Sequence, residues 1–134
     1  MIDDTYYITT PIYYVNDVPH IGTAYCTVAA DVQARFQRLL GKEVFFLTGT
    51  DENATKVAQA ARDAGKEPQE FCDELSERFN EVWRVYNISH DDFIRTTEER
   101  HTRTVRAFTA QLYVSGSIYA DFYEGWYCVF EETF

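Results

Sequence analysis

Cysteine is scarce in this 134-residue chain, and long apolar runs are missing. The three cysteines, Cys26, Cys72 and Cys128, are far apart in sequence and belong to no CxxC motif or close Cys/His pair. This pattern disfavours a disulfide framework and a zinc site, so we expect buried or half-buried thiols. No apolar run approaches the roughly 18 residues that span a membrane, and no signal peptide opens the chain. We therefore expect a cytoplasmic protein without membrane contact.

Basic residues are also in short supply. Twelve lysines and arginines stand against 22 aspartates and glutamates, which gives a net charge of −10. Non-specific affinity for nucleic acids comes mainly from a diffuse positive surface, which this chain lacks. Any contact with a nucleic acid is therefore expected to come largely from elsewhere.

Hydrophobic and aromatic residues are abundant, at 46% and 16% of the chain. This composition indicates a globular rather than a disordered protein. A chain of 134 residues is normally one domain, and it is long enough to bury a core.

The first third of the chain predicts a strand, a helix and a second strand. Residues 6–10 form a short β-branched and tyrosine-rich run, and residues 43–48 form a continuous apolar run typical of a strand covered on both faces. Between them, residues 21–40 carry apolar side chains at helical spacing, and Gly41 follows as an expected C-terminal cap. The apolar positions of this helix are Tyr25, Val28, Val32, Phe36 and Leu39. The pattern predicts an α/β fold with a right-handed parallel βαβ unit.

Two more helices are predicted downstream. Residues 55–64 read as a short helix closed by Gly65, and Pro68 is well placed to open the next one. The second helix has a wide apolar stripe, which we interpret as core. The stripe consists of Phe71, Leu75, Phe79, Val82, Trp83 and Tyr86.

The last third predicts a short strand over residues 93–96, a helix and a β hairpin. Thr96 and Glu99 have the spacing of a capping box for a helix that runs to about Ser115. The apolar residues expected to face inward from this helix are Val105, Phe108 and Leu112. From residue 118 onward aromatic residues alternate, which suggests a hairpin or ribbon around Gly125.

Loops 11–20 and 49–54 are expected at the carboxyl ends of the parallel strands, where α/β sheets bind their ligands. The first loop ends in His20-Ile21-Gly22 at a helix start, whose N–H groups and dipole favour a phosphate. Gly22 has no Cβ, so a ligand can approach the backbone, and His20 can donate a hydrogen bond to a phosphate oxygen. A loop histidine without a ligand is the alternative interpretation of His20 alone.

Four motifs in order resemble bacterial methionyl-tRNA synthetases. The first is Tyr7-Ile8-Thr9-Thr10-Pro11-Ile12-Tyr13-Tyr14 followed by Pro19-His20-Ile21-Gly22, and the second is Val44-Phe45-Phe46-Leu47-Thr48-Gly49-Thr50-Asp51-Glu52. The third is Asp92-Phe93-Ile94-Arg95-Thr96-Thr97, and the fourth is Glu124-Gly125-Trp126-Tyr127-Cys128. Together they cover nearly the whole chain.

This resemblance implies the first half of a Rossmann-like, parallel-sheet nucleotide-binding domain. The half-domain would occupy residues 1–116, and residues 117–134 would begin the family's connective-peptide insertion. The implied reaction joins methionine and ATP, with Mg²⁺ expected, into methionyl-adenylate, which then acylates the 3′ end of tRNA. The family places anticodon recognition in a later domain, so we expect this acidic stretch to contribute little tRNA contact.

The resemblance also implies roles for individual residues. His20 and Gly22 match the first and third letters of the family's HIGH signature, and Thr23 stands at the fourth. These three residues are the expected ATP-binding group, with His20 and Thr23 as the catalytic pair. Three further residues are expected to bind methionine, namely Ile12, Tyr14 and Asp51. Asp51 would hold the ammonium group, a role that its charge suits, whereas the alternative is an acidic loop residue or a helix cap before residue 55.

Three departures from the family pattern affect these expectations. Thr23 replaces a histidine and cannot carry a positive charge toward phosphate, and a lost transition-state donor can cost about 2.7–4 kcal/mol. Asn53-Ala54 replaces His-Gly, which removes a titratable group and a residue that easily adopts a positive φ. Cys128 is followed by Glu131 where metal-binding members have a second cysteine, so we expect no zinc. His90 and His101 lie in polar surroundings and are expected to be solvated.

Two other possibilities remain open at this stage. The chain could be a non-catalytic module of this family that binds methionine or a nucleotide or serves as an interaction module, an interpretation that Thr23 and Asn53-Ala54 favour. It could also be the truncated product of a longer reading frame without independent function. The sequence beyond the codon for Phe134 would separate these cases.

Overall fold

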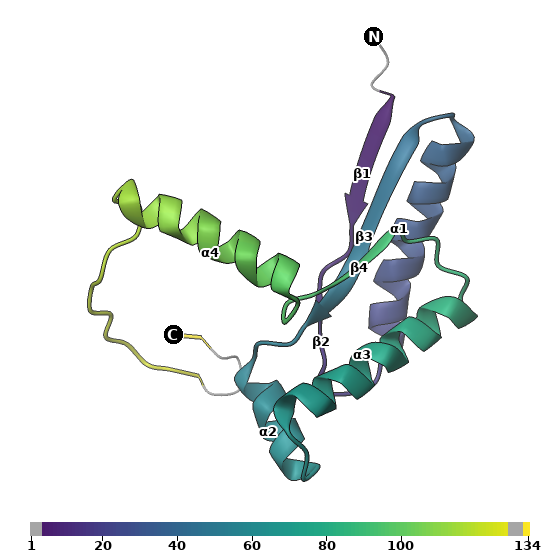
Figure 1. Cartoon of the computed structure of the whole chain (residues 1–134). Helices are drawn as coiled ribbons and strands as arrows, with labels where there is room; N and C mark the ends of the chain where they lie inside the picture. Colours follow the sequence, from purple (N-terminus) through teal and green to yellow (C-terminus); the bar gives the residue numbers. More distant parts are fainter. Residues whose placement is uncertain (1–3, 129–132) are drawn as a thin grey trace. The chain divides into compact units, whose positions relative to one another are not determined.

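The computed structural model describes residues 4–128 and 133–134 (Figure 1). The chain divides into two compact units, residues 1–102 and residues 103–134, and each is described by itself. In chain order the elements are β1 (Thr5–Thr9), β2 (Tyr13–Tyr14), α1 (Ile21–Leu39), β3 (Glu43–Asp51), α2 (Thr55–Asp63), α3 (Pro68–Val85), β4 (Asp92–Arg95) and α4 (Glu99–Val114).

The sheet is parallel throughout, and β3 is its central strand. β1 pairs with residues 43–47 of β3, β2 with residues 50–51 and β4 with residues 47–50. Leu47 pairs with both Thr9 and Asp92, so β1 and β4 lie on opposite edges of β3. The predicted parallel βαβ unit is therefore confirmed. β3 is three residues longer than predicted, and β2 was not predicted at all.

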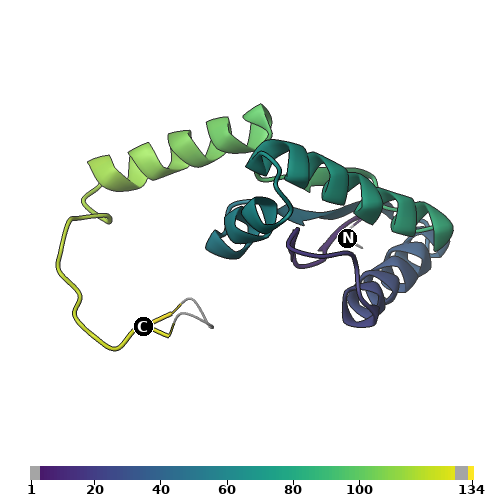
Figure 2. The same cartoon turned by 90° about the horizontal axis from the view of Figure 1, so that it is seen from below.

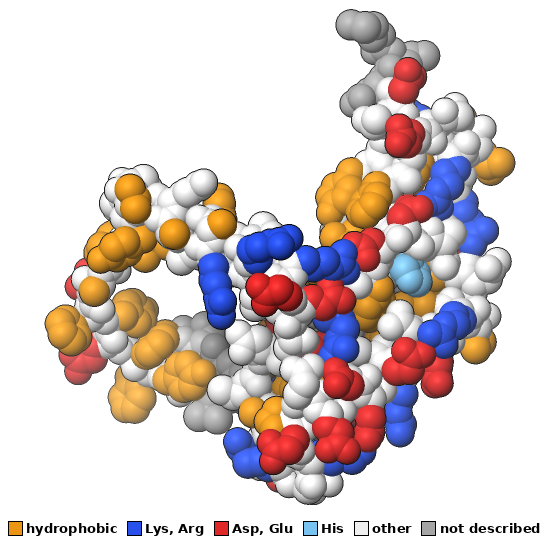
Figure 3. Space-filling model, in the orientation of Figure 1, with side chains coloured by type: hydrophobic (Ala, Val, Ile, Leu, Met, Phe, Trp, Pro, Cys, Tyr) orange, Lys and Arg blue, Asp and Glu red, His pale blue; other side chains and the backbone are white. Residues whose placement is uncertain are grey.

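Helix α1 covers one face of this sheet. The Gln33 Nε2 group donates a hydrogen bond to the hydroxyl of Tyr6 at 3.3 Å, and Phe46 is fully buried. On the other face the rings of Tyr7 and Phe45 stack with centroids 6.0 Å apart, and these residues are 62% and 46% exposed. Figure 3 shows hydrophobic side chains gathered over β1. Within the described residues this face of the sheet remains open.

The core of the first unit lies between α3, α2 and the segment that follows β1. Its fully or almost fully buried members are Val15, Val57, Cys72, Leu75, Phe79 and Trp83. Figure 2 shows α2 and α3 side by side. The predicted apolar stripe of α3 is confirmed as core, except that Tyr86, just past the helix end, is exposed.

In helices α1 and α4 the buried positions differ from those that the apolar patterns predicted. All five apolar positions that predicted α1 are exposed, and the helix instead buries Thr23, Thr27, Asp31, Ala34 and Gln37. The prediction that α4 turns its apolar residues inward was wrong for Val105 and Phe108, which are exposed, while Leu112 is partly buried. No described residue of α4 is fully buried. Among residues 4–128 and 133–134, the apolar positions that predicted α1 stay exposed, as do Val105 and Phe108 of α4.

The predicted capping box of Thr96 and Glu99 was also wrong. α4 begins at Glu99, and the Thr96 hydroxyl instead accepts a hydrogen bond from the backbone N–H of Glu52 at 2.9 Å. A side chain that satisfies the backbone of another segment is not available to cap its own helix.

In the second unit the described residues after α4 form almost no regular secondary structure. Residues 118–127 form no strand, so a hairpin around Gly125 is not present there, and an antiparallel bridge joins Cys128 and Thr133. The rings of Tyr123 and Tyr127 pack against Phe134 at centroid distances of 4.9 and 5.2 Å. The predicted domain boundary after residue 116 stays a prediction. None of the described helices is long and apolar enough to cross a membrane.

Candidate active site

His20 forms the N-terminal cap of α1. Its Nδ1 atom accepts hydrogen bonds from the backbone N–H groups of Gly22 at 3.1 Å and Thr23 at 3.4 Å. A neutral imidazole that accepts at Nδ1 carries its hydrogen at Nε2. Two of the helix amides that the sequence suggested for a phosphate, those of Gly22 and Thr23, are thus already satisfied by His20. His20 Nε2–H is left as a donor for a ligand.

Gly22 makes this cap possible. A Cβ atom on Gly22 would lie 3.0 Å from Cε1 and 3.1 Å from Nδ1 of His20, tighter than ordinary contacts. The missing side chain therefore lets the imidazole fold back over the helix start. The sequence predicted a different benefit, close approach of a ligand, and that role of Gly22 stays a prediction.

Four of the predicted site residues line one cavity of about 280 Å³, which we call the loop cavity. These residues are Ile12, Tyr14, His20 and Thr23. Thr23 is only 6% exposed, so the residue at the fourth HIGH position lies within the fold rather than on a solvated surface. Sequence reasoning missed five other lining residues, Tyr13, Asn16, Asp17, Val18 and Phe79.

Tyr13 fixes β2 beneath this cavity. Its hydroxyl lies 2.9 Å from Thr27 Oγ1, which in turn donates to the carbonyl of Thr23 at 3.1 Å. Since Thr27 has one hydroxyl hydrogen, Tyr13 is the donor in the first bond. The Tyr13 ring stacks on Phe79 with centroids 6.0 Å apart, and burial raises the pKa of the phenol. Ile12 and Tyr14, the neighbours of Tyr13 in sequence, line the same cavity.

Asp51 is the last residue of β3 and pairs directly with Tyr14 of β2. Its Oδ1 atom accepts the backbone N–H of Asn53 at 3.2 Å, and it forms no ion pair with any lysine or arginine in the described parts of the chain. The N-cap of α2 is Ala54, which excludes the alternative that Asp51 caps that helix. Asp51 does not line the loop cavity, but strand pairing brings it to the same end of the sheet as Tyr14.

Glu52 is a second acidic residue at this point, and sequence reasoning missed its role. Its side chain is fully buried and forms an ion pair with Arg95, with Nε–Oε1 at 2.6 Å and Nη2–Oε2 at 3.1 Å. Burial raises the pKa of the Glu52 carboxyl, but the hydrogen bonds from Arg95, Ser76 and Thr97 outweigh it and leave the pKa below its usual value. The sequence feature that could have indicated this role is the third motif, which contains both Arg95 and Thr97, two of the hydrogen-bond donors to Glu52.

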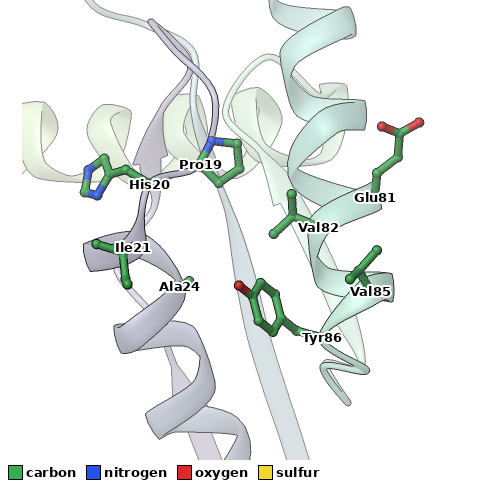
Figure 4. Close-up of a pocket in the computed structure, with 8 residues that line it drawn as sticks. All are labelled: Pro19, His20, Ile21, Ala24, Glu81, Val82, Val85 and Tyr86. Carbon is green, nitrogen blue, oxygen red and sulfur yellow. The ribbon is translucent and has the colours of Figure 1, made fainter.

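A larger cavity of about 510 Å³ lies between α1 and α3 (Figure 4). Ile21 and Ala24 line it from α1, and Val82, Val85 and Tyr86 line it from the end of α3. Of the predicted site residues only His20 borders it. His20 therefore borders both cavities, whereas Ile12, Tyr14 and Thr23 line only the smaller one.

The remaining histidines and cysteines do not form a site. His90 is half-buried, burial lowers its pKa, and its buried Nδ1 has no hydrogen-bond partner among the described residues, so the prediction of a solvated His90 was wrong. His101 is also only partly exposed. Cys72 is buried as predicted, and burial raises its thiol pKa to about 11, whereas Cys26 and Cys128 are exposed.

No group of three or more His, Cys, Asp or Glu side chains in residues 4–128 and 133–134 is placed to hold a metal ion. Glu131, which the zinc argument paired with Cys128, lies outside the described residues. The expected absence of zinc therefore stays a prediction.

Comparison with known protein families shows to which family the chain belongs. The family model described as tRNA synthetases class I (M) matches residues 6–134. The chain belongs to this family. The resemblance found in the sequence is thereby confirmed, and the match covers all four motifs.

The most similar proteins agree with this assignment. The chain is 58% identical over 129 residues to methionine–tRNA ligase of Thermotoga maritima and 59% identical over 133 residues to that of Rickettsia bellii, which covers 96% and 99% of this chain. Mycobacterium tuberculosis methionyl-tRNA synthetase in complex with methionyl-adenylate matches 95% of this chain with a TM-score of 0.90 at 44% identity. This match confirms the Rossmann-like α/β fold class. The chain spans only 20%, 26% and 25% of the length of these three proteins, respectively.

Proposed function

We propose that this protein is part of a methionine–tRNA ligase, which uses ATP to activate methionine as methionyl-adenylate and transfers it to tRNA. The observation that carries the proposal is the loop cavity, where Ile12, Tyr14, His20 and Thr23 meet at the carboxyl end of a parallel sheet. Strand pairing places Asp51 beside Tyr14 at the same end. The match to a structure that holds methionyl-adenylate supports this assignment.

In this proposal Asp51 binds the ammonium group of methionine. Its carboxylate has no cationic partner among the described residues, and charge-assisted hydrogen bonds from an ammonium are strong. Ile12 and Tyr14 are both partly exposed at the cavity and offer apolar surface to the methionine side chain. The three residues thus present one charge and two apolar surfaces, which suits an amino acid with an unbranched apolar side chain.

ATP would bind at the start of α1, with His20 Nε2–H directed to a phosphate oxygen and Gly22 and Thr23 beside it. The methionine carboxylate attacks the α-phosphate and pyrophosphate leaves, so no protein nucleophile is required. The protein positions the two substrates and stabilises charge on the phosphates. Mg²⁺ would arrive with the phosphates as part of the substrate.

This proposal includes three further expectations, which concern the partner, the cellular compartment and the domain boundaries. tRNA would be a partner of the complete gene product, with little contact from the acidic residues described here. The protein would act in the cytoplasm. Residues 1–116 would belong to the nucleotide-binding half-domain, and residues 117–134 would open the connective-peptide insertion.

The substitution Asp51→Asn tests the methionine site. In methionine-dependent exchange of pyrophosphate into ATP by the complete gene product, we expect the KM for methionine to rise about ten- to hundredfold, because a hydrogen bond to a charged group contributes about 1.5–3 kcal/mol. The KM for ATP should change little. Asp63→Asn is the matched control, since Asp63 is an exposed acid at the end of α2. An unchanged KM for methionine in Asp51→Asn would remove Asp51 from the site.

A second candidate is a binding module of the same family that does not turn over. The observation that favours it is Thr23, which is buried and cannot carry a positive charge toward the phosphates. Such a module would bind methionine through Asp51 but show no exchange of pyrophosphate. The same assay, combined with calorimetric titration of methionine, separates the two candidates.

A further inference from the structure

The carboxylate of Glu52 accepts an unusually large number of hydrogen bonds for an acidic residue at the end of a strand. Its buried carboxylate accepts hydrogen bonds from Thr50 of β3 at 3.0 Å, from Ser76 of α3 at 2.5 Å and from Arg95 of β4 at 2.6 Å. Thr97, which follows β4, donates a further hydrogen bond. One carboxylate thus joins three elements and the start of the segment after β4.

The backbone of Glu52 is held from the same direction. Its N–H group donates to Thr96 Oγ1 at 2.9 Å, while Thr96 N–H donates to the carbonyl of Thr50 at 3.3 Å. Arg95 also pairs with Asp73 of α3 at 2.5 Å. The peptide bond between Asp51 and Glu52 is therefore fixed by the hydrogen bond of the Glu52 N–H group. The side chain of Glu52 is fixed in addition by its own hydrogen bonds.

Asp51 by contrast has few side-chain contacts, although its backbone pairs with Tyr14 of β2. Its carboxylate makes one hydrogen bond, to the N–H of Asn53, and its carbonyl accepts from Val15 N–H at a long 3.4 Å. The direction of the Asp51 side chain consequently depends on the backbone held by Glu52. Catalytic and binding groups need such support, because a displacement of about 1 Å can cost roughly a hundredfold in rate.

Stability alone does not explain a buried ion pair at this place. Removing two charges from water costs several kcal/mol for each ion, and a well-packed apolar pair of similar volume is often at least as stable. The pair of Glu52 and Arg95 has one feature that an apolar pair would lack, a fixed geometry set by a bidentate contact.

We propose that Glu52 and Arg95 form a positioning pair that holds the Asp51 carboxylate in the direction required to bind the methionine ammonium. This inference rests on the proposed function, and it adds two residues that touch neither substrate. Arg95 connects the third family motif to the second. The pair is therefore expected to control affinity for methionine and not affinity for ATP.

The test is a double-mutant cycle of Glu52→Gln with Asp51→Asn in the complete gene product. Glu52→Gln keeps the side-chain volume but removes the charge. We expect it to raise the KM for methionine at least about threefold, within the range of coupling between neighbouring residues, and to leave the KM for ATP unchanged. In the Asp51→Asn background the same change should have almost no further effect on the KM for methionine, because Glu52 acts through Asp51.

The control is Glu77→Gln, which breaks an exposed ion pair with Arg84 on α3 at 2.7 Å. It should change neither KM. If Glu52→Gln does not fold, Thr97→Val is the substitute variant. Thr97 is exposed, and the substitution removes one hydrogen-bond donor to the Glu52 carboxylate. It should also raise the KM for methionine.

The outcomes distinguish this inference from the proposed function. If Asp51→Asn raises the KM for methionine but Glu52→Gln and Thr97→Val do not, the positioning role is wrong and the proposed function stands. Equal increases from Glu52→Gln in both backgrounds would also overturn it, because the effect would then bypass Asp51. If Asp51→Asn itself changes nothing, the proposed methionine site fails.

Discussion

At the scale of single residues, two aromatic rings organise the start of the candidate site. His20 covers the first amides of α1 with Nδ1 and leaves Nε2–H for a ligand. Tyr13 anchors β2 to α1 through Thr27 and to α3 through Phe79. Neither ring acts alone, since the backbone of Thr23 contacts both systems. A small polar network thus sets where the loop between β2 and α1 begins and ends.

The hydroxyl of Tyr13 is the part of this network that can be removed without creating a large cavity. Tyr13→Phe keeps the stacking on Phe79 and Trp83 but deletes the hydrogen bond to Thr27. We expect the free energy of unfolding to fall by about 0.5–1.5 kcal/mol, measured by chemical denaturation. Tyr25→Phe is the control, because Tyr25 is exposed on α1 and should show almost no change. Equal stability of Tyr13→Phe and the parent protein would show that the network does not hold β2.

The motif residues of the site were predictable one by one, whereas the contacts that position them were not. Ile12, Tyr14, His20 and Thr23 come from a continuous sequence pattern, and the structure places them in one cavity. The network of Glu52 joins residues up to 47 positions apart, from Thr50 to Thr97. No local spacing encodes such contacts, since they depend on how β4 and α3 meet the end of β3.

At the scale of elements, the close approach of β4 to β3 sets the geometry around Arg95. Gly49 lies in β3 opposite Ile94, and a Cβ atom there would lie 2.1 Å from the carbonyl oxygen of Ile94 and 2.6 Å from its Cγ2. Backbone atoms cannot yield as a flexible side chain can, so any side chain at residue 49 must push the two strands apart. Gly49 is therefore a packing requirement of the sheet.

The substitution Gly49→Ala is expected to be costly for this reason. Overpacking of this kind typically costs about 1–3 kcal/mol, which should lower the thermal unfolding midpoint clearly. Gly125→Ala is the matched control, because the nearest atoms to a Cβ there lie at 3.5 Å or more. If both substitutions have the same small effect, the strands are not as closely packed as the structure shows.

Helix positions were easier to predict than helix faces. The spacing of apolar residues located α1 within one residue at its C-terminal end, yet the buried face of α1 is polar. Asp31 on that face accepts hydrogen bonds from the N–H and hydroxyl groups of Ser89, each at 2.6 Å, and pairs with Arg35 at 2.6 Å. Apolar periodicity is blind to such polar burial, because the partner groups come from a distant loop. Strand β2 was missed because two residues carry no periodicity at all.

At the scale of the whole molecule, the described residues form a half-covered sheet with the candidate site at its carboxyl end. The rings of Tyr7 and Phe45 form an exposed apolar stack on the uncovered face, and the apolar stripe of α1 is exposed as well. Large exposed apolar surfaces commonly mark contact sites. The chain is also strongly acidic, so phosphate recognition must depend on a few placed donors such as His20 rather than on a positive field.

The central proposal is that this protein is part of an enzyme that activates methionine, and the most direct measurement is the amino-acid dependence of pyrophosphate exchange into ATP. The assay uses the complete gene product, purified free of host synthetase, with methionine, leucine, isoleucine and valine compared at equal concentration. We expect exchange with methionine and only background exchange with the branched amino acids, whose side chains differ in shape from that of methionine. Absence of exchange with methionine, or equal exchange with leucine, would contradict the account.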